Sequence, residues 1–525
     1  MKTRKVSISV FQILISIIVI IAIVLGIIAV KNVVTKKQNA NKEKTTFEGS
    51  GTSEDAYQIS KVEDLINLLL DINKGRTYDG KHFVLQTNLN LQEDSSYNNP
   101  NDKSFGDLNN DGKTEEIKKE LTTGDGLRLI GKKDLNSKKD REVIFKGIFD
   151  GNGKTISNLE IKISDDNTNQ NIGLFGENKG TILNLRIIEK LEITNIEKSN
   201  LNIGLLAGKN SGIIQKCKTE GEIKLVTEKE TETLVAGLAG ENVGKIIDSV
   251  NEVNIESNCT KAGITAKNTK IEGTEDSGVI TNCTSNGIIS EEKSYNKYTA
   301  GIVALNEKGT ITNCTNNGKI SGKKVGGIIG SSTGDVIASK NTGELNNITE
   351  NLDNNNEIAG GIVATLEGGT IENCKNTGKV TGVTYIGGIT GQNKGVITQS
   401  RNDGELKKID QTSVGNVYLG GITGYNYSGS RISNSKNYGN IKSDQDNLVI
   451  VGGVCGYLEN NSFIDYCENN SFITAVGKII TPNEDTSLKC TSCVSNGGGK
   501  AGTSESGELY IGLIYGKCPI ESEEE

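Results

Sequence analysis

A stretch that recurs along the chain constrains its fold more than any other feature. The sequence GGITGQNKGVITQSRNDGEL (Gly387 to Leu406) has close variants in GGIIGSSTGDVIASKNTGEL (Gly326 to Leu345) and GGIVATLEGGTIENCKNTGKV (Gly360 to Val380). The shared frame is G-G-I-x-G followed by G-x-I-x-N-[CS]-x-N-x-G-x-[IV]. A unit of this length cannot bury its apolar residues alone, so successive units must stack on one another as a solenoid.

The repeat also predicts the class of solenoid. The second glycine of the opening pair, or its equivalent, marks ten units that begin 26 to 38 residues apart: Gly173, Gly204, Gly237, Gly263, Gly301, Gly327, Gly361, Gly388, Gly421 and Gly453. Short β-branched runs such as GIVAL, GTITNC and GKI alternate with Gly and Asn, which indicates strands and turns rather than helices. Three runs in a unit predict about three strands per coil, with Gly or Asn at corners that need positive φ. The sequence therefore predicts an all-β fold, a parallel β-helix (β-solenoid) of about ten coils.

Composition and charge agree with an elongated β-solenoid. The 525 residues include 3 prolines, which would remove ladder hydrogen bonds, and no tryptophan. The net charge is -8, and because the first 45 residues hold eight basic residues and one acidic residue, the remainder carries -15. An acidic surface argues against nucleic acid as a partner.

The N-terminal segment predicts a membrane anchor. Residues 6–30 carry no charge and lie between Lys5 and Lys31. As a helix they would extend about 37 Å, enough for the hydrocarbon core of about 30 Å. A cleaved signal peptide would have a shorter apolar region and an Ala-x-Ala-like site. We expect residues 1–5 to be cytoplasmic, residues 6–30 to be a transmembrane signal anchor, and the polar residues 31–53 to be a flexible stalk.

Residues 54–145 predict a small α/β cap on the N-terminal end of the solenoid. In SKVEDLINLLLDIN, Ser60 and Glu63 form a capping box and Gly75 suits the end of the helix. One helical face is apolar and contains Leu65, Ile66, Leu69 and Ile72. The alternating segment at 82–91 predicts a strand. Helix and strand together would cover the first open edge of the solenoid.

Several stretches resemble bacterial surface proteins that carry GLUG-motif repeats. They are AYQISKVEDL (Ala56 to Leu65), FKGIFDGNGKTISNL (Phe145 to Leu159) and GLFGENKGTILNL (Gly173 to Leu185), and the Gly-Leu-x-Gly core recurs as GLAG (Gly237 to Gly240). One departure is Arg128-Leu129-Ile130-Gly131, where relatives usually have Trp-x-Pro-Ile-Gly. The resemblance implies a solenoid on the cell surface, with the C-terminal part of the chain outside the membrane. We expect repeats at 146–475 and a C-terminal cap with an acidic tail at 476–525.

One insertion in the predicted cap has the start of a calcium loop. The segment DLNNDGKTEEIK (Asp107 to Lys118) places the oxygen ligands Asp107, Asn109 and Asp111 at alternate positions before a glycine. Its twelfth position is Lys118 instead of a glutamate, so Glu115 is a candidate closing ligand. Calcium would order this insertion, and the alternative is a solvated loop.

Cysteines recur at one position of the repeat and alternate there with serine. The position is occupied by Leu185, Cys217, Ser249, Cys283, Cys314, Ser339, Cys374, Ser400, Ser435 and Cys467. A disulfide framework would not exchange Cys for Ser so freely, so this pattern predicts small buried residues with free thiols. Cys490, Cys493 and Cys518 fall in the predicted C-terminal cap, where one disulfide to Cys518 is an open alternative.

Tyrosines concentrate in the last coils and form a candidate binding surface. They are Tyr418, Tyr425, Tyr427, Tyr438, Tyr457 and Tyr466. Exposed rings on one regular face would stack on sugar rings or anchor a protein partner. The alternative is that the rings fill wide corners of the solenoid.

The sequence favours a binding protein over an enzyme. Glu222, Glu344 and Glu405 follow the same repeat glycine, so they should form a surface row rather than a catalytic pair. Relatives of the repeat flank immunoglobulin-cleaving metallopeptidases, but with His82 as the sole histidine no H-E-x-x-H motif exists. We therefore expect a single-pass membrane protein with an extracellular repeat domain, an adhesin or structural surface protein that binds a protein or glycan. The alternative is a carbohydrate-active β-helix enzyme, a polysaccharide lyase or hydrolase.

Overall fold

The computed structural model describes residues 47–73, 75–91, 144–158, 171–194, 200–274, 277–291, 297–348, 356–409, 416–443 and 449–476, and short strands between 478 and 517. The predicted anchor at 6–30 and the predicted calcium loop at 107–118 lie outside these residues. The chain divides into two compact units, Met1–Glu48 and Gly49–Glu525, and the second contains all the repeats. Among the described residues, no helix is long and apolar enough to cross a membrane.

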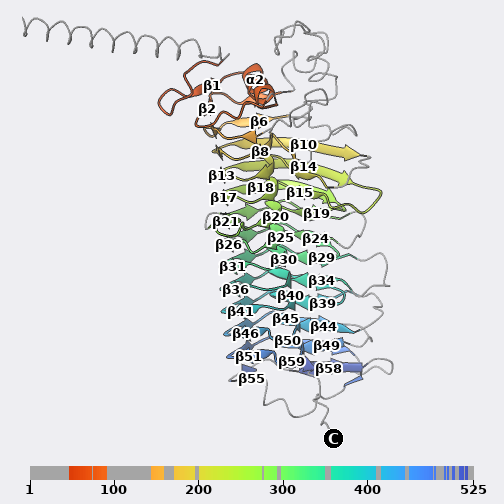
Figure 1. Ribbon diagram of the computed structural model, residues 1–525. Helices are drawn as coiled ribbons and strands as arrows, with labels where there is room; N and C mark the ends of the chain where they lie inside the picture. The colour runs from red at the N-terminus through yellow and green to blue at the C-terminus, as the bar shows by residue number, and fades with distance from the viewer. Residues whose placement is uncertain are drawn as a thin grey trace, which may run out of the picture. The chain divides into compact units, whose positions relative to one another are not determined.

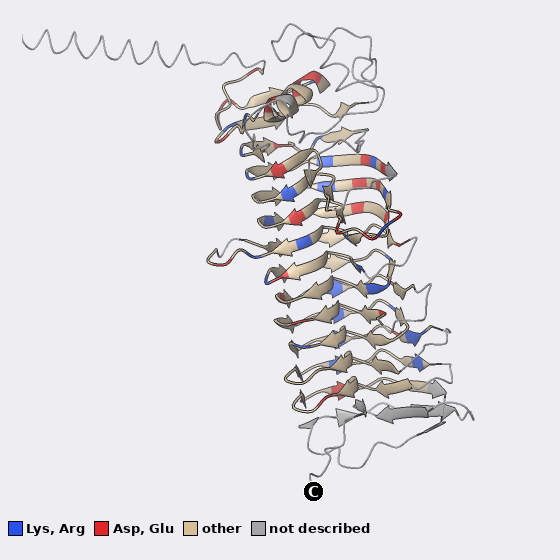
Figure 2. Cartoon of the chain, turned by 45° about the vertical axis from the view of Figure 1, so that its right-hand side comes forward, with Lys and Arg blue, Asp and Glu red and all other residues tan. Residues whose placement is uncertain are grey.

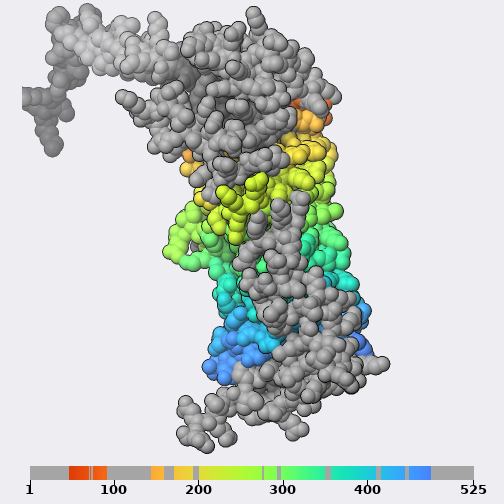
Figure 3. Space-filling model, turned by 90° about the vertical axis from the view of Figure 1, so that its right-hand side faces the viewer, coloured from red at the N-terminus to blue at the C-terminus, as the bar shows by residue number. Residues whose placement is uncertain are grey.

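The second unit is a parallel β-solenoid whose coils stack along one axis (Figure 1). One coil consists of five short strands: β24 (Tyr298–Ala300), β25 (Val303–Glu307), β26 (Thr310–Thr312), β27 (Thr315–Asn316) and β28 (Ile320–Gly322). Equivalent strands of successive coils pair in parallel and form four long sheets. We number the sheets in the order in which a coil visits them: β24 lies in sheet 1, β25 in sheet 2, β26 in sheet 3, and β27 and β28 in sheet 4. Figure 3 shows the described coils in chain order along this axis.

The predicted coils are present, but each has more strands than expected. Sheet 2 contains 12 strands. Ten follow the ten marker glycines, and β4 (Ile144–Phe145) and β59 (Tyr515–Lys517) extend the stack at its two ends. The prediction of three strands per coil was wrong. The chain also bends at the glycine pair between sheets 1 and 2 and at a left-handed residue between sheets 3 and 4, such as Asn313 with φ 52°, and each bend ends a strand.

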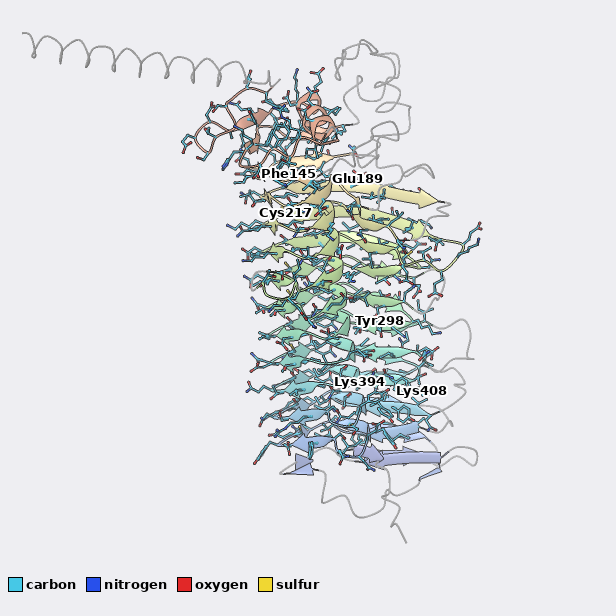
Figure 4. The ribbon with its side chains drawn as sticks, viewed as in Figure 1. Phe145, Glu189, Cys217, Tyr298, Lys394 and Lys408 are labelled. Atoms are coloured by element: carbon cyan, nitrogen blue, oxygen red, sulfur yellow. The ribbon has the colours of Figure 1, made fainter. Side chains whose placement is uncertain are left out.

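A column of aliphatic side chains forms the core beneath sheet 3. Each strand contributes its central residue, in register with the next, and these residues are 0% exposed: Ile182, Ile214, Ile246, Ile280 and Ile311. Burying one such side chain contributes about 1.5–3 kcal/mol. At the N-terminal end Phe149 and Phe83 continue this column. Phe145 and Phe175 of sheet 2 stack on each other there, with 4.7 Å between ring centroids (Figure 4).

The three glycines of G-G-I-x-G each occupy a place where a side chain would clash. A Cβ at Gly387 would lie 1.9 Å from the Thr390 carbonyl oxygen. At Gly388 it would lie 2.2 Å from the carbonyl oxygen of Gly421 in the next coil. At Gly391 it would lie 2.4 Å from Cγ2 of Ile358, because the strands of sheets 1 and 2 approach closely across their corner. The glycines of the motif are therefore required for steric reasons, because only they allow the close approach of backbone at the corner between sheets 1 and 2.

Asparagine has two separate roles in the repeat, and the sequence predicted the first of them. The asparagine before the Cys/Ser position has positive φ at a corner, as expected. The asparagine two residues after that position is buried, and its amide nitrogen donates to the amide oxygen of the equivalent asparagine one coil on, at 2.8–3.1 Å. This first asparagine ladder consists of Asn316, Asn341, Asn376, Asn402, Asn437 and Asn469, which are all 0% exposed.

A second asparagine ladder runs along sheet 2. Amide donors and acceptors 2.7–2.9 Å apart join Asn178, Asn210, Asn242, Asn268 and Asn306, and Asn306 donates to Ser332 Oγ at 3.0 Å. Each ladder satisfies buried amides between coils, so the interior of this solenoid is partly polar and hydrogen-bonded.

The cysteine column is buried, as predicted. Cys217, Cys283, Cys314, Cys374 and Cys467 are free thiols that are at most 1% exposed. Their serine equivalents are buried too and donate to backbone carbonyls, as Ser400 Oγ does to Thr398 O at 2.9 Å. Cys490 begins β55 (Cys490–Thr491), whereas Cys493 and Cys518 lie outside the described residues.

Burial predicts that these thiols are inert in the native protein. It raises the pKa of Cys217, Cys374 and Cys467 to about 12, so the thiolate that reacts with alkylating reagents is scarce at neutral pH. We expect iodoacetamide to leave all three unmodified in native protein and to modify them in urea, as mapped by peptide mass spectrometry. Native alkylation at the rate seen in urea would contradict the buried column.

The N-terminal cap has the expected elements with one different contact. The helix α2 (Val62–Asn73) buries the predicted apolar face and ends at Gly75, whose φ is 89°. Its start is capped by Asp64, which accepts the backbone N–H groups of Ser60 and Lys61 at 2.9 and 3.1 Å. The expected capping box of Ser60 and Glu63 is therefore replaced by this Asp64 cap.

Four strands in the predicted cap, among them β1 (Tyr57–Ile59) and β4, join the sheets of the solenoid. Within the predicted strand, β2 (His82–Leu85) pairs with β5 (Ile148–Asp150) in sheet 3, and β3 (Leu89–Asn90) pairs with β6 (Thr155–Ser157) in sheet 4. At the other end, strands of the range 476–525 continue the ladders, since β58 (Glu508–Gly512) pairs with β49 (Val449–Gly452).

Candidate binding surface

Five tyrosines of the C-terminal coils form one contact cluster at the corner of sheets 1 and 2. Tyr385 in β39 (Tyr385–Gly387) is in register with Tyr418 in β44 (Val417–Gly420). Tyr425 in β45 (Thr423–Asn426) is in register with Tyr457 in β50 (Cys455–Leu458). Tyr427 follows β45. All five side chains are half-buried. We call this set the tyrosine cluster.

The rings contact one another both along a sheet and across the corner. Tyr385 stacks on Tyr418 at 5.2 Å, and Tyr425 stacks on Tyr457 at 4.8 Å between ring centroids. Across the corner, Tyr418 meets Tyr425 edge to face at 5.0 Å. Tyr427 lies 4.6 Å from Tyr425. Edge-to-face and offset pairs of this kind are favourable by about 0.5–1.5 kcal/mol each, so the cluster is preorganised.

Hydrogen bonds and ion pairs hold the rim of the cluster. The Tyr425 hydroxyl donates to Glu459 Oε1 at 2.7 Å, and burial together with this carboxylate raises the pKa of Tyr425. Asn416 Nδ2 donates to the Tyr418 hydroxyl at 3.2 Å. Lys394 lies 5.1 Å from the Tyr427 ring centroid (Figure 4) and pairs with Glu367 at 2.7 Å. Lys394 and Glu367 next to the rings therefore pair with each other, and Glu459 is held by a hydrogen bond from Tyr425.

The same outward positions carry charges in the N-terminal coils. In sheet 2 the row that contains Tyr425 and Tyr457 begins with Glu177, Lys209, Glu241 and Lys267. Lys209 pairs with Glu241 at 3.0 Å. The long strands β10 (Arg186–Thr194), β14 (Lys218–Val226) and β18 (Val250–Ser257) also carry cross-coil ion pairs (Figure 2). In this row of sheet 2 the N-terminal coils thus carry charges, and the tyrosines belong to the C-terminal coils.

The structure brings together four of the six predicted tyrosines. Tyr438 lies in sheet 4, where the Arg401 guanidinium is 4.1 Å from its ring centroid. Tyr466 is 57% exposed at a left-handed corner with φ 49°. Sequence reasoning missed Tyr385, although it precedes its glycine pair by the same two positions as Tyr418, in YIGG and YLGG. Aligning the repeats on the glycine pair would have found it.

The acidic residues that follow the repeat glycine form a surface row, as predicted, and each of them pairs with a lysine. Glu222 lies 3.7 Å from the Lys190 ammonium, Glu344 lies 3.3 Å from Lys319, and Glu405 lies 3.1 Å from Lys379. Each lysine belongs to the neighbouring coil. Among the described residues no group of three or more His, Cys, Asp or Glu side chains could hold a metal ion. The predicted ligands Asp107, Asn109, Asp111 and Glu115 lie outside those residues.

Comparison with known proteins supports the type of repeat. The family model described as the GLUG motif matches residues 355–381, which confirms the predicted resemblance to GLUG-repeat proteins. No curated protein matches the chain. A crystal structure of a protein from Bacteroides ovatus, provisionally assigned as an immunoglobulin A1 protease, matches at 14% identity and a TM-score of 0.25, over 86% of each chain. The chain thus carries a GLUG motif at residues 355–381, within the parallel β-solenoid described above.

Proposed function

We propose that this chain is a cell-surface binding protein that holds neutral glycans at its tyrosine cluster. In this proposal, residues 6–30 anchor the chain in the cell membrane and the coils project outward as a rigid scaffold. The observation that carries the proposal is the contact cluster of five half-buried tyrosines at the corner of sheets 1 and 2.

The chemistry of the cluster favours a sugar as its ligand. A pyranose ring has an apolar face of C–H groups, which stacks on tyrosine, and a rim of hydroxyls, which needs polar partners. The cluster supplies stacked rings together with the carboxylates of Glu367 and Glu459 and the amide of Asn416. Because Lys394 and Glu367 already pair with each other, we expect an uncharged ligand. The ion-paired row of Glu222, Glu344 and Glu405 supports binding without turnover.

The test is glycan binding by the full-length protein in detergent. We expect neutral oligosaccharides to bind on an array and in calorimetry, and Tyr418→Ala to weaken binding about tenfold, equivalent to roughly 1.4 kcal/mol for one stacked ring. Tyr425→Phe keeps the ring but loses the hydrogen bond to Glu459, so the loss should be smaller.

Tyr466→Ala is the matched control because this tyrosine is exposed and lies outside the cluster. It should leave the affinity unchanged. Equal affinity for Tyr418→Ala, with an unchanged circular dichroism spectrum, would overturn the proposed site. Release of shorter sugars from a bound glycan would overturn the proposal of binding without turnover.

A further inference from the structure

A lysine and a glutamate meet inside the solenoid, away from the tyrosine cluster. Lys261 lies in β19 (Thr260–Ala262) of sheet 1, in register with Val235 and Thr299, which are both 0% exposed. Glu291 follows β23 (Ile289–Ser290), the last sheet 4 strand of the same coil. The Lys261 Nζ lies 3.9 Å from Glu291 Oε2, and both side chains are 0% exposed. The two groups are therefore sealed from solvent in mutual contact.

This pair interrupts the inward row of sheet 1, which is aliphatic in most of the coils. Beyond it, Val325, Ala359, Ile386 and Leu419 continue the inward row of sheet 1 within one hydrophobic cluster. Replacing a buried ion pair by apolar residues is often neutral or stabilising, so an ion pair alone does not explain why the core is polar here. A covalent bond between the two groups would remove both charges from the interior.

We propose that Lys261 and Glu291 condense into an intramolecular amide that joins the start of this coil to its end. The Lys261 ε-nitrogen attacks the Glu291 side-chain carbonyl carbon, a C–N bond forms and the C–OH bond breaks. The hydroxyl leaves with an amine hydrogen as one water molecule. No atom is oxidised or reduced, and no further reactant is needed.

The surroundings favour this reaction in three ways. Burial lowers the pKa of Lys261, which favours the uncharged amine that acts as the nucleophile. Exclusion of bulk water removes the competing hydrolysis. The third feature is the space beside the carboxyl group. Thr299 Oγ1 is buried and has no hydrogen-bond partner among the described residues. It lies on the same side of Gly322 as Glu291 Oε2. A Cβ at Gly322 would lie 2.7 and 2.9 Å from these two oxygens, so glycine there leaves room for the rearranging carboxyl.

A second lysine–glutamate pair supplies an internal comparison. Lys323 Nζ lies 3.8 Å from Glu357 Oε1, almost the same separation, but the Lys323 side chain is 12% exposed. Water can therefore reach this ammonium, so the pair lacks the sealed surroundings of Lys261 and Glu291. The proposal predicts a cross-link at Lys261 and none at Lys323.

Mass spectrometry of the full-length protein tests the proposal directly. We expect an intact mass lower than the calculated mass by one water molecule, and a proteolytic digest that contains one branched peptide joining Lys261 to Glu291. Lys261→Met should restore the calculated mass, and Lys323→Met should keep the mass deficit of one water.

An intact wild-type mass at the calculated value, with separate linear peptides for the two residues, would overturn the proposal. A mass deficit without the branched peptide would also overturn it, because the lost water would then come from another site. Both measurements use the wild-type chain, so the outcome does not depend on whether a variant folds. The result is also independent of the ligand proposed for the tyrosine cluster.

Discussion

Replacing Asn402 with leucine is expected to lower the free energy of unfolding by about 4 kcal/mol, because at least two buried polar groups would lose a partner at about 1–3 kcal/mol each. Asn402 accepts from Asn376 Nδ2 at 2.8 Å and donates to Asn437 Oδ1 at 2.9 Å. It also donates to Gly404 O at 3.0 Å and accepts from Gly404 N at 3.2 Å. Leucine has a similar size but can make none of these bonds. Urea unfolding followed by circular dichroism measures the loss.

An exposed asparagine in the same kind of arrangement provides the control. Asn317 Nδ2 donates to Asn286 Oδ1 at 2.9 Å on the surface. Water can replace this bond, so Asn317→Leu should change the free energy of unfolding by no more than about 0.5 kcal/mol. Similar losses for the two variants would show that burial of the first asparagine ladder is unimportant.

The second asparagine ladder shows how the chain itself adapts to leucine. Leu366 takes the ladder position after Ser332, and the Ser332 hydroxyl turns to donate to Gly334 O at 2.9 Å. Leu458 takes the same ladder position in a later coil, and the equivalent residue one coil before it is Asn426. The Nδ2 of Asn426 has no hydrogen-bond partner among the described residues. A serine before the leucine therefore avoids the unpaired donor that an asparagine leaves.

The features that follow from the repeat period were predictable from the sequence. The spacing of the glycines predicted the coils, and the alternation of Cys with Ser predicted a buried column of small residues. Both depend on equivalent residues lying above one another in successive coils, which any solenoid of this period imposes. The isoleucines under sheet 3 follow from the same rule.

Features that depend on the path within a coil were not predictable in the same way. The two asparagines of N-[CS]-x-N look equivalent in sequence, but the first lies at an exposed corner and the second inside the coil, as Asn373 and Asn376 show. The tyrosine cluster depends on the sharp corner between sheets 1 and 2, which brings Tyr418 onto Tyr425. Neither the corner angle nor the direction of a side chain is encoded in the repeat period.

Gly361→Ala is expected to be at least as disruptive as the loss of a ladder asparagine. The new Cβ would lie 2.0 Å from the carbonyl oxygen of Gly388 in the next coil and 2.6 Å from Cγ of Asn376 in the first asparagine ladder. Relief requires the coils to separate, which breaks ladder hydrogen bonds as well. We expect a loss of about 4 kcal/mol or more in the free energy of unfolding, measured by urea unfolding.

Gly368 belongs to the same GLUG motif and makes the matched comparison. A Cβ at Gly368 would meet nothing within 4 Å. Gly368→Ala should therefore leave the protein unchanged or stabilise it by about 0.4–1 kcal/mol, because alanine restricts the unfolded chain. If both variants unfolded at the same urea concentration as the wild type, close packing between coils would not explain the glycine pair. A loss confined to Gly361→Ala would instead show that the motif exists to let one coil lie directly on the next.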